Sequence, residues 1–547
     1  MNDTLAGLLQ VALLLVLLAA CYAPLGDYMA RVFTSEKDWR IEAALYRFVR
    51  VDARSGQRWP TYALGVLGFS FVSIVLLYLL QRLQPVLPMS FGRGAVEPSM
   101  AFNTAISFVT NTNWQSYVPE QVVGNTVQMA GLTVQNVLSA AVGLAIAAAL
   151  IRGFVRAGTD RIGNFWVDLT RATLRIMLPL SLVAAVGLLA MGVTMSLRSG
   201  VDIGGSTVPL APTASQEAVK MLGTNGGGIF NANSAHPFEN PNALSNLFEN
   251  FLMLVIPVSM TRTFGTMVGN RRQGTVLLSV MGALWGALLA VAWFAETHPN
   301  GAAGIAAGSL EGKETRFGIP GSILFGVSTT GTSTGAVNSL HDSYSGGAGG
   351  VTLLNILLGE VAPGGVGVGL VGILVIAIIA MFLAGLMVGR TPEYLGKKLG
   401  QREVTFAAVY ILVMPAIVLL GAGLAIALPG TLDALNNDGA HGFSEVLYAF
   451  ASAANNNGSA FAGITVTSDF FQSTLGLAMV FGRFVLILAV LALAGSLARQ
   501  KRVEATAGTL ATDKPLFGVL VGGTLILVAA LTFFPALALG PLAEALS

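Results

Sequence analysis

Ten apolar stretches dominate this chain, and each is long enough to cross a lipid bilayer as a helix. Crossing the hydrocarbon core takes about 20 apolar residues in helical conformation. The stretches begin near Leu5, Pro60, Met129, Leu174, Leu247, Val276, Val351, Val404, Leu475 and Phe517. Charged residues make up 11% of the 547 residues, whereas a soluble domain has roughly 25%. These properties exclude a soluble globular enzyme and predict an all-α integral membrane protein.

Composition argues against several other classes of function. The net charge of +2 creates no basic field that would attract nucleic acid. The single cysteine, Cys21, argues against a disulfide framework and against a zinc or iron–sulfur site built from this chain. The sequence has no Gly-Lys-Ser/Thr phosphate loop, so we expect it to bind no nucleotide. The histidines fall in outer loops without metal-ligand spacing and are assigned no metal; they are His236, His298, His341 and His441.

The distribution of lysine and arginine predicts the orientation in the membrane. Twenty-three of the 30 basic residues fall in five alternate loops, and six fall in the loops on the other side. The basic loops are 31–58, 152–175, 262–272, 390–402 and 499–514. Because basic loops remain in the cytoplasm, we predict that both termini lie on the outer side.

The outer loops carry an internal repeat. Four of them, at about 83–127, 197–245, 297–350 and 428–472, are too long for simple turns. Each contains a short apolar or amphipathic run followed by a polar segment rich in Gly, Asn, Thr and Ser. The order span, short helix, polar segment, span therefore occurs four times. We divide the chain into a leading helix with a basic cytoplasmic loop (1–58), four repeats (59–157, 158–272, 273–400 and 401–502) and a trailing helix (503–547).

The four polar segments align on one triplet each. The triplets are Asn111-Thr112-Asn113, Thr224-Asn225-Gly226, Ser333-Thr334-Gly335 and Asn456-Asn457-Gly458. Their third residues are 113, 109 and 123 positions apart, and all are Gly or Asn. These residue types tolerate a positive φ best, so we expect the third position to need it.

Irregular backbone at membrane depth is tolerated only where protein buries it or where it lines a water-filled cavity. Four such segments around one axis would direct carbonyl oxygens to a common point, where they could replace the hydration shell of a cation. We therefore predict a pseudo-fourfold cation filter whose ligands are backbone carbonyls. The preceding runs would be pore helices, at 99–109, 214–222, 321–329 and 443–453. The alternative is that these are ordinary outer loops with turn residues.

The third repeat contains a break in its second apolar run. Residues 359–369 combine clustered glycines with Pro363, which interrupts a helix. An unwound hinge below the third triplet, including Gly364 and Gly365, could gate a pore or open a side exit, or it could be a packing kink. Glu360 in this segment is an intramembrane acid, and such residues are functional candidates by default.

Arg483 lies near the middle of the ninth apolar stretch. A mid-membrane arginine costs at least about 2.5 kcal/mol on insertion scales, so it should face the interior. Below a cation filter it would oppose leakage to the cytoplasm. The alternative is a structural ion pair, for instance with Glu360, or a contact with a backbone carbonyl.

Several strings of this sequence resemble one known family. They are FVTNTNWQSY at 108–117, GTNGGG at 223–228, FNANS at 230–234, HPFENP at 236–241, EGKE at 311–314, GAV at 335–337, HDS at 341–343 and NNNGSAF at 455–461. Over essentially its whole length the chain resembles the KdpA family, the potassium-translocating subunits of bacterial Kdp potassium-transporting ATPases. One departure is Thr334, where family members can carry cysteine.

The resemblance implies a fold of the potassium-transporter superfamily, with four membrane–pore–membrane repeats in the bacterial cytoplasmic membrane. It implies that K+ enters from the periplasm at the four triplets, with Gln115 near the mouth, and passes sideways to a P-type ATPase subunit, KdpB, which hydrolyses ATP. This chain would itself be non-catalytic. Further implied partners are the single-span subunit KdpC, the short peptide KdpF and membrane lipid. Arg483 matches the positive residue of the family below the filter, and the broken helix matches its internal loop.

One other class of machine shares such a filter. A Trk/Ktr-type potassium channel or symporter subunit would be gated by a cytoplasmic nucleotide-binding partner and would need no ATPase subunit. Arg483 and the helix break do not separate the two on physical grounds, whereas the family strings favour the pump.

Overall fold

The computed structural model describes residues 3–299, 309–504 and 509–546. Ten helical segments within these ranges are long and apolar enough to cross a membrane. They are α1 (Asp3–Thr34), α3 (Trp59–Arg82), α6 (Val134–Val155) with the π-turn Val127–Thr133 before it, α7 (Phe165–Arg171) continuing through 172–177 into α8 (Leu178–Ala190), α10 (Ala243–Met267), α11 (Arg271–Thr297), α15 (Val368–Met387), α16 (Gln401–Ala427), α18 (Asp469–Arg499) and α19 (Pro515–Leu539). The prediction of an all-α protein with ten spans is confirmed.

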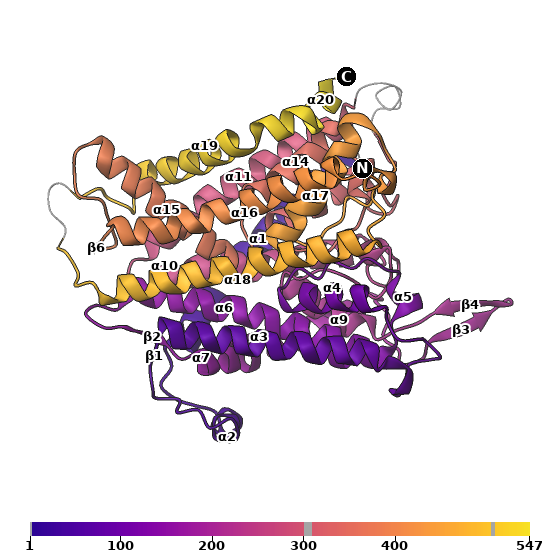
Figure 1. The fold of residues 1–547 in the computed structure, drawn as a ribbon, viewed down its shortest axis with the longest axis horizontal. Coiled ribbons are helices and arrows are strands. Elements are labelled where there is room, and N and C mark those ends of the chain that lie inside the picture. The colour runs from indigo at the N-terminus through magenta and orange to yellow at the C-terminus, as the bar shows by residue number, and fades with distance from the viewer. Residues whose placement is uncertain (1–2, 300–308, 505–508, 547) are drawn as a thin grey trace.

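The remaining helices are short. Four of them precede the four triplets: α4 (Pro98–Val109), α9 (Thr213–Leu222), α13 (Gly318–Gly331) and α17 (Gly439–Asn455). They coincide with the predicted pore helices within a few residues at each end. Figure 1 shows α4, α9 and α17 toward one end of the molecule, the end at which α1 begins and α20 (Pro541–Leu546) ends.

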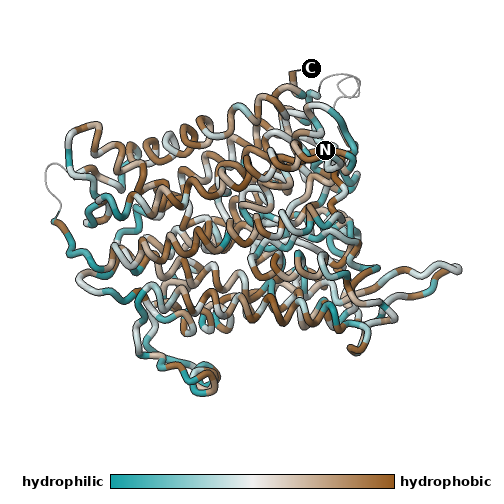
Figure 2. The backbone as a smooth tube through the Cα atoms, in the orientation of Figure 1, coloured by the Kyte–Doolittle hydropathy of each residue, from teal (hydrophilic) through white to brown (hydrophobic). Residues whose placement is uncertain are grey.

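The two long helices of each repeat differ in burial. The second ones, α6, α10, α15 and α18, have 89, 78, 67 and 67% of their apolar windows buried. The first ones, α3, α7/α8, α11 and α16, have 28 to 39% buried. Figure 2 shows apolar residues along the middle of the helices and polar residues at their ends. Each repeat therefore contributes one inner helix to the core and one outer helix that presents apolar side chains outward, as a surface facing lipid requires.

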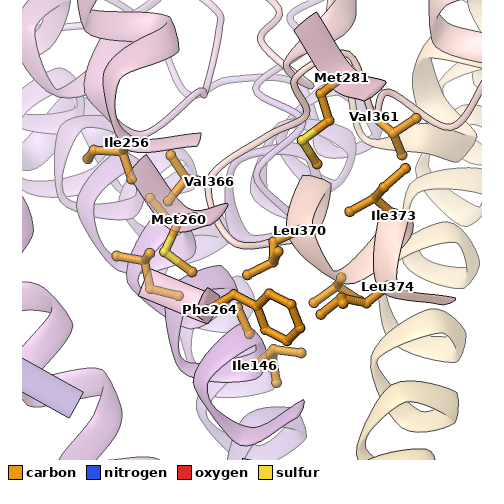
Figure 3. Close-up of a cluster of buried hydrophobic side chains, with 14 of the residues drawn as sticks. Ile146, Ile256, Met260, Phe264, Met281, Val361, Val366, Leu370, Ile373 and Leu374 are labelled. Carbon is orange, nitrogen blue, oxygen red and sulfur yellow. The ribbon is translucent and has the colours of Figure 1, made fainter. Parts of the chain in front are cut away.

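The seventh span differs from its predicted position. Instead of one span beginning near Val351, the third repeat has a short helix, α14 (Gly346–Leu357), then non-helical residues 358–367, then the 20-residue helix α15. The predicted break is therefore present. It is packed among apolar side chains, where Val361 and Val366 lie close to α10, α11 and α15 (Figure 3).

Some elements were not predicted. Helix α2 (Arg40–Phe48) lies in the first basic loop, and α5 (Pro119–Val122) follows the first triplet. Strands β1 (Gln57–Arg58) and β2 (Arg161–Gly163) pair across two basic loops, and β5 (Glu393–Tyr394) pairs with β6 (Lys397–Lys398). Strands β3 (Gly200–Ile203) and β4 (Ser206–Pro209) form a hairpin that projects from the end with the short helices (Figure 1). The alternation of apolar and polar residues in 201–203, followed by Gly204-Gly205, is typical of a β-hairpin.

Candidate functional site: four helix ends around one axis

Each of the four short helices ends in the same way. The first residue of each triplet has a left-handed backbone, with φ of 68° at Asn111, 44° at Thr224, 55° at Ser333 and 59° at Asn456. The next residue donates its N–H to the carbonyl five residues earlier, at 2.9 to 3.0 Å in all four repeats. This six-to-one hydrogen bond after a left-handed residue is the Schellman arrangement.

The conformation differs from the one predicted from residue type. A positive φ was expected at the third position of each triplet. It occurs there at Asn113 (59°) and Gly458 (96°), but Gly226 and Gly335 are not in that region. The position common to all four repeats is instead the first one, because the left-handed residue is what ends each short helix.

Most backbone N–H groups of the triplets donate to the end of the preceding short helix. For the first strand, Thr112 and Asn113 both donate their N–H groups to the carbonyl of Ser107. For the fourth strand, Asn457 donates to Ser452 O, and Gly458 donates to Ser452 Oγ at 3.0 Å. In these two strands the N–H groups are thus directed back to the short helices, and this is the polarity a cation site requires; the N–H of Gly335 in the third strand instead donates to Asn225 O.

The four strands approach one another closely enough to form a closed ring. Gly335 donates its N–H to Asn225 O, and Asn111 Nδ2 donates to Thr224 O at 2.9 Å. A Cβ added to Gly335 would lie 2.7 Å from the carbonyl carbon of Gly458. The order of neighbours around the ring is therefore first, second, third and fourth strand.

Glycine is required at these contacts. A Cβ on Gly458 would overlap Thr112 O, and a Cβ on Gly226 would overlap Gly335 Cα. No side chain fits there without moving the neighbouring strand. The ring closes because the third positions of the second, third and fourth strands carry no Cβ where they cross a neighbouring strand.

Small polar side chains brace the strands from behind. Ser107 Oγ donates to Trp114 O at 2.8 Å, and Thr329 Oγ1 donates to Ala336 O at 2.6 Å. Asn225 Nδ2 donates to Asn111 Oδ1 at 2.7 Å and so joins the second strand to the first. Side chains of Ser, Thr and Asn near the triplets thus hold the strands to the short helices and to one another.

A cavity of about 510 Å³ lies at the ring, and none of the residues 358–367 that form the helix break lines it. Its lining includes one residue from each strand: Asn113, Gly227, Gly335 and Gly458. Gln115 also lines it, and its Oε1 accepts from the N–H of Gly228 at 2.9 Å. Gln115 therefore holds the first strand to the second at the mouth.

A buried charge cluster behind the second strand was not predicted. Lys220 is 0% exposed, and its Nζ pairs with Glu217 at 2.7 Å and with Glu239 at 2.9 Å. Lys220 also donates to Asn233 Oδ1 at 3.0 Å, and Asn233 Nδ2 in turn donates to Gly227 O. The cluster therefore fixes a filter carbonyl indirectly. A Glu and a Lys three residues apart in a short helix were the available signal.

The helix break lies directly beneath the second and third strands. Gly364 donates its N–H to Gly331 O at 2.8 Å, and Val366 donates to Thr224 Oγ1 at 2.9 Å. A Cβ on Gly365 would lie 2.8 Å from Thr332 O. The predicted segment of Glu360, Pro363, Gly364 and Gly365 is thus in contact with the candidate filter.

Glu360 and Arg483 do not pair. Ser333 Oγ donates to Glu360 Oε2, and Glu360 Oε1 has no partner among the described residues. Arg483 is 6% exposed and makes no hydrogen bond or ion pair with any residue that the structure describes. A Cβ added to Gly143 would lie 2.5 Å from Val366 O and 3.7 Å from Arg483 Nη2, so the guanidinium is close to the broken segment. Arg483 therefore stands beside the break as a buried, unneutralised cation.

The structure therefore brings the predicted site residues together in one region. The predicted filter residues are Asn111, Thr112, Asn113, Gln115, Thr224, Asn225, Gly226, Ser333, Thr334, Gly335, Asn456, Asn457 and Gly458.

His341, in the loop after the third strand, is buried, and its Nδ1 forms a hydrogen bond with Tyr448 Oη at 3.0 Å. Burial, together with nearby Lys313, lowers the pKa of His341 to about 3, so this histidine stays neutral.

Comparison with known proteins identifies the family. The model of the family "KdpA: Potassium-transporting ATPase A subunit" matches residues 12–546. The chain is 62% identical over 560 residues to the potassium-transporting ATPase potassium-binding subunits of Rhodococcus erythropolis and Nocardia farcinica, with 100% of each chain covered. The subunit of the same name from Streptomyces coelicolor is 56% identical over 553 residues, again with 100% of each chain covered.

The fold also has a structural relative. The potassium transporter TrkH from Vibrio parahaemolyticus superimposes with a TM-score of 0.55 at 15% identity, covering 89% of this chain and 98% of that one. At this identity the likeness concerns the fold alone. By the family match and by its curated relatives, the chain belongs to the KdpA family of potassium-transporting ATPase A subunits.

Proposed function

We propose that this chain is the potassium-binding and potassium-translocating subunit of an ATP-driven, high-affinity potassium uptake complex. The observation that carries the proposal is the closed ring of four triplets, each following a short helix that ends in the same left-handed turn. The names of the curated relatives support potassium as the ion.

In this proposal, the triplets bind K+ through backbone carbonyls. Left-handed turns direct the N–H groups into the short helices, so the carbonyl oxygens of the strands remain to replace water around the ion. The carboxyl ends of α4, α9, α13 and α17 point to the ring and add negative potential. Gln115 holds the first strand to the second at the mouth of the filter. K+ is the transported ion here, and this chain binds no nucleotide.

The break beneath the ring is proposed to control the exit. Glu360, Pro363, Gly364 and Gly365 occupy the path below the second and third strands, and Arg483 repels a cation that would move straight to the cytoplasm. A cavity of about 70 Å³ lies beside the break, lined by Gly359, Val361 and Tyr410. It supports a sideways exit rather than a straight one.

The chain needs partners to couple transport to ATP. We propose that a P-type ATPase subunit, KdpB, hydrolyses ATP and receives the ion, with KdpC and possibly KdpF completing the complex. We further propose that the complex lies in the bacterial cytoplasmic membrane with both termini of this chain on the periplasmic side, and that the repeats at 59–157, 158–272, 273–400 and 401–502 are its structural units.

The experiment is an ATPase titration of the purified chain, alone and with the subunits that co-purify with it. We expect the chain alone to be inert and the complex to show hydrolysis that K+ stimulates and Na+ does not. The Trk/Ktr-type alternative is compatible with the fold likeness to TrkH, which does not favour it over the pump. It would prevail if no ATPase co-purifies and the chain alone passes K+ down its gradient in liposomes.

A further inference from the structure

Three side chains that could ligate a metal meet at the rim of the outer cavity. They are Asp342, in the turn His341–Ser343 after the third strand, and His441 and Glu445 on α17. One ligand atom from each lies within 4.8 Å of the other two. His441 and Glu445 are four residues apart, so they share one face of the helix. The four-residue spacing of His441 and Glu445 is the sequence signal for this cluster, and it departs from the prediction that the histidines bind no metal.

Glu445 is the observation that points to a ligand. Its side chain is fully buried, yet its Oε2 has no hydrogen-bond partner among the described residues, while Oε1 accepts from Asn437 Nδ2 at 2.7 Å. An unpaired carboxylate oxygen is costly to bury. A cation between Glu445 and its neighbours would satisfy it.

The space around these carboxyl groups is kept open by a glycine. A Cβ on Gly463 would lie 2.7 Å from Asp342 Oδ1 and 2.5 Å from Glu445 Cδ. Gly463 does not need a positive φ, so packing and not backbone conformation selects glycine here. The two carboxyl groups therefore sit in a cradle that any larger residue would fill.

The imidazole of His441 is oriented from its other side. Its Nε2 lies 3.0 Å from Asp342 Oδ1, and its Nδ1 lies 2.9 Å from Glu544 Oε1 in α20. A carboxylate that accepts from the second nitrogen of a ligating histidine fixes the ring and raises its basicity. Glu544 is placed to do this.

We propose that Asp342, His441 and Glu445 form a site for a divalent transition-metal cation such as Zn2+ on the outer face of this chain. The set of one imidazole and two carboxylates suits Zn2+ or Mn2+ better than Mg2+ or Ca2+, which prefer oxygen ligands alone. The bound ion joins the loop after the third filter strand to the short helix before the fourth, and Glu544 holds α20 against them.

A proton competes with the metal for His441. His441 forms hydrogen bonds through Nε2 with Asp342 and through Nδ1 with Glu544. Because a ligating imidazole must lose the proton on Nε2, metal binding releases a proton.

The test is Zn2+ binding to the purified complex, after treatment with a chelator, by competition with a chromophoric chelator. We expect one tight equivalent in the wild type and at least about a tenfold weaker site in Asp342→Asn and in Glu445→Gln. Glu544→Gln should weaken binding about 10- to 100-fold while keeping the equivalent, as second-sphere changes do. His298→Ala is the matched control, because that outer histidine stacks on Phe294 and is not one of the three clustered ligands, and it should bind as the wild type does.

A second readout separates loss of the site from loss of the fold. Zn2+ should raise the melting temperature of the wild-type complex and of His298→Ala, and should not raise that of Glu445→Gln, whose metal-free melting temperature should stay close to the wild-type value. The proposal is overturned if the wild type binds no stoichiometric Zn2+, or if Asp342→Asn and Glu445→Gln bind it as tightly as the wild type. In either case the cluster is a protonated histidine clamp and not a metal site.

Discussion

At the scale of single residues, the candidate filter depends on which positions carry a Cβ. The left-handed first residues are Asn, Thr, Ser and Asn, so side chains are tolerated where each helix ends. Where strands cross, the chain has glycine, because the neighbouring backbone occupies the place of a Cβ. The two requirements fall on different positions of the same triplet.

Gly458→Ala tests this distinction. Its φ is 96°, and its Cβ would overlap Thr112 O. A left-handed alanine costs roughly 1–2 kcal/mol before any overlap, and about 1.4 kcal/mol is a tenfold change in an equilibrium constant. We expect the K+ concentration for half-maximal ATPase stimulation to rise about tenfold or more.

Gly423→Ala is the control for that substitution. Gly423 lies in the outer helix α16, and a Cβ there meets no atom within 4 Å. It should leave the K+ response unchanged. An unchanged K+ response in Gly458→Ala as well would remove the fourth triplet from the filter.

Arg483→Ala tests the barrier below the ring. Arg483 is buried without an ion pair to any described residue, so its removal should unblock the path without leaving an unpaired partner. We expect passive Rb+ flux through liposomes containing the complex in the absence of ATP, and more ATP hydrolysed per ion moved. Arg483→Lys keeps the charge and should remain tight. If Arg483→Ala lowers only the yield of protein, the residue is structural.

At the scale of elements, the buried cluster on α9 connects a helix to a filter carbonyl. Lys220→Met leaves Glu217 and Glu239 buried without their cation, and breaking a buried ion pair in this way costs about 3–5 kcal/mol. We expect a lower melting temperature of the complex and a weaker K+ response, because Asn233 and hence Gly227 O lose their support.

Arg58→Met is the matched control for the charge cluster. Arg58 pairs with Asp160 at 2.6 Å, but its side chain is 60% exposed. An exposed pair contributes at most about 1 kcal/mol, so the melting temperature should hardly change. Equal effects of Lys220→Met and Arg58→Met would show that the cluster does not support the second strand.

The elements divide clearly into those a sequence can predict and those it cannot. Length and apolar character predict the number of spans, although the break shifts the seventh to Val368–Met387, and the burst of Gly and Asn after a short apolar run predicts the four short helices. The left-handed first residue of each triplet depends on how a helix ends, and Asn, Thr and Ser give no unique signal for it. The meeting of Asp342 with His441 depends on two repeats packing together, which no local pattern specifies.

At the scale of the whole molecule, the fourfold arrangement follows from burial. Each repeat places its second long helix inside and its first outside, so the four short helices converge between the inner ones. The third repeat keeps this plan although its inner helix is broken at 358–367. Apolar side chains of α10, α11 and α15 pack against the break (Figure 3). The break is therefore part of the packed core.

The central claim is that K+ binds within the ring of the four triplets. Its most direct test is to locate Tl+, a K+ analogue with strong anomalous scattering, in crystals of the complex. We predict an anomalous peak within coordination distance of backbone oxygens of Thr112, Asn225, Thr334 and Asn457 or of the residues that follow them, and loss of that peak when K+ is added in excess but not when Na+ is. A Tl+ peak outside the ring, or one that Na+ displaces as readily as K+, would contradict the account.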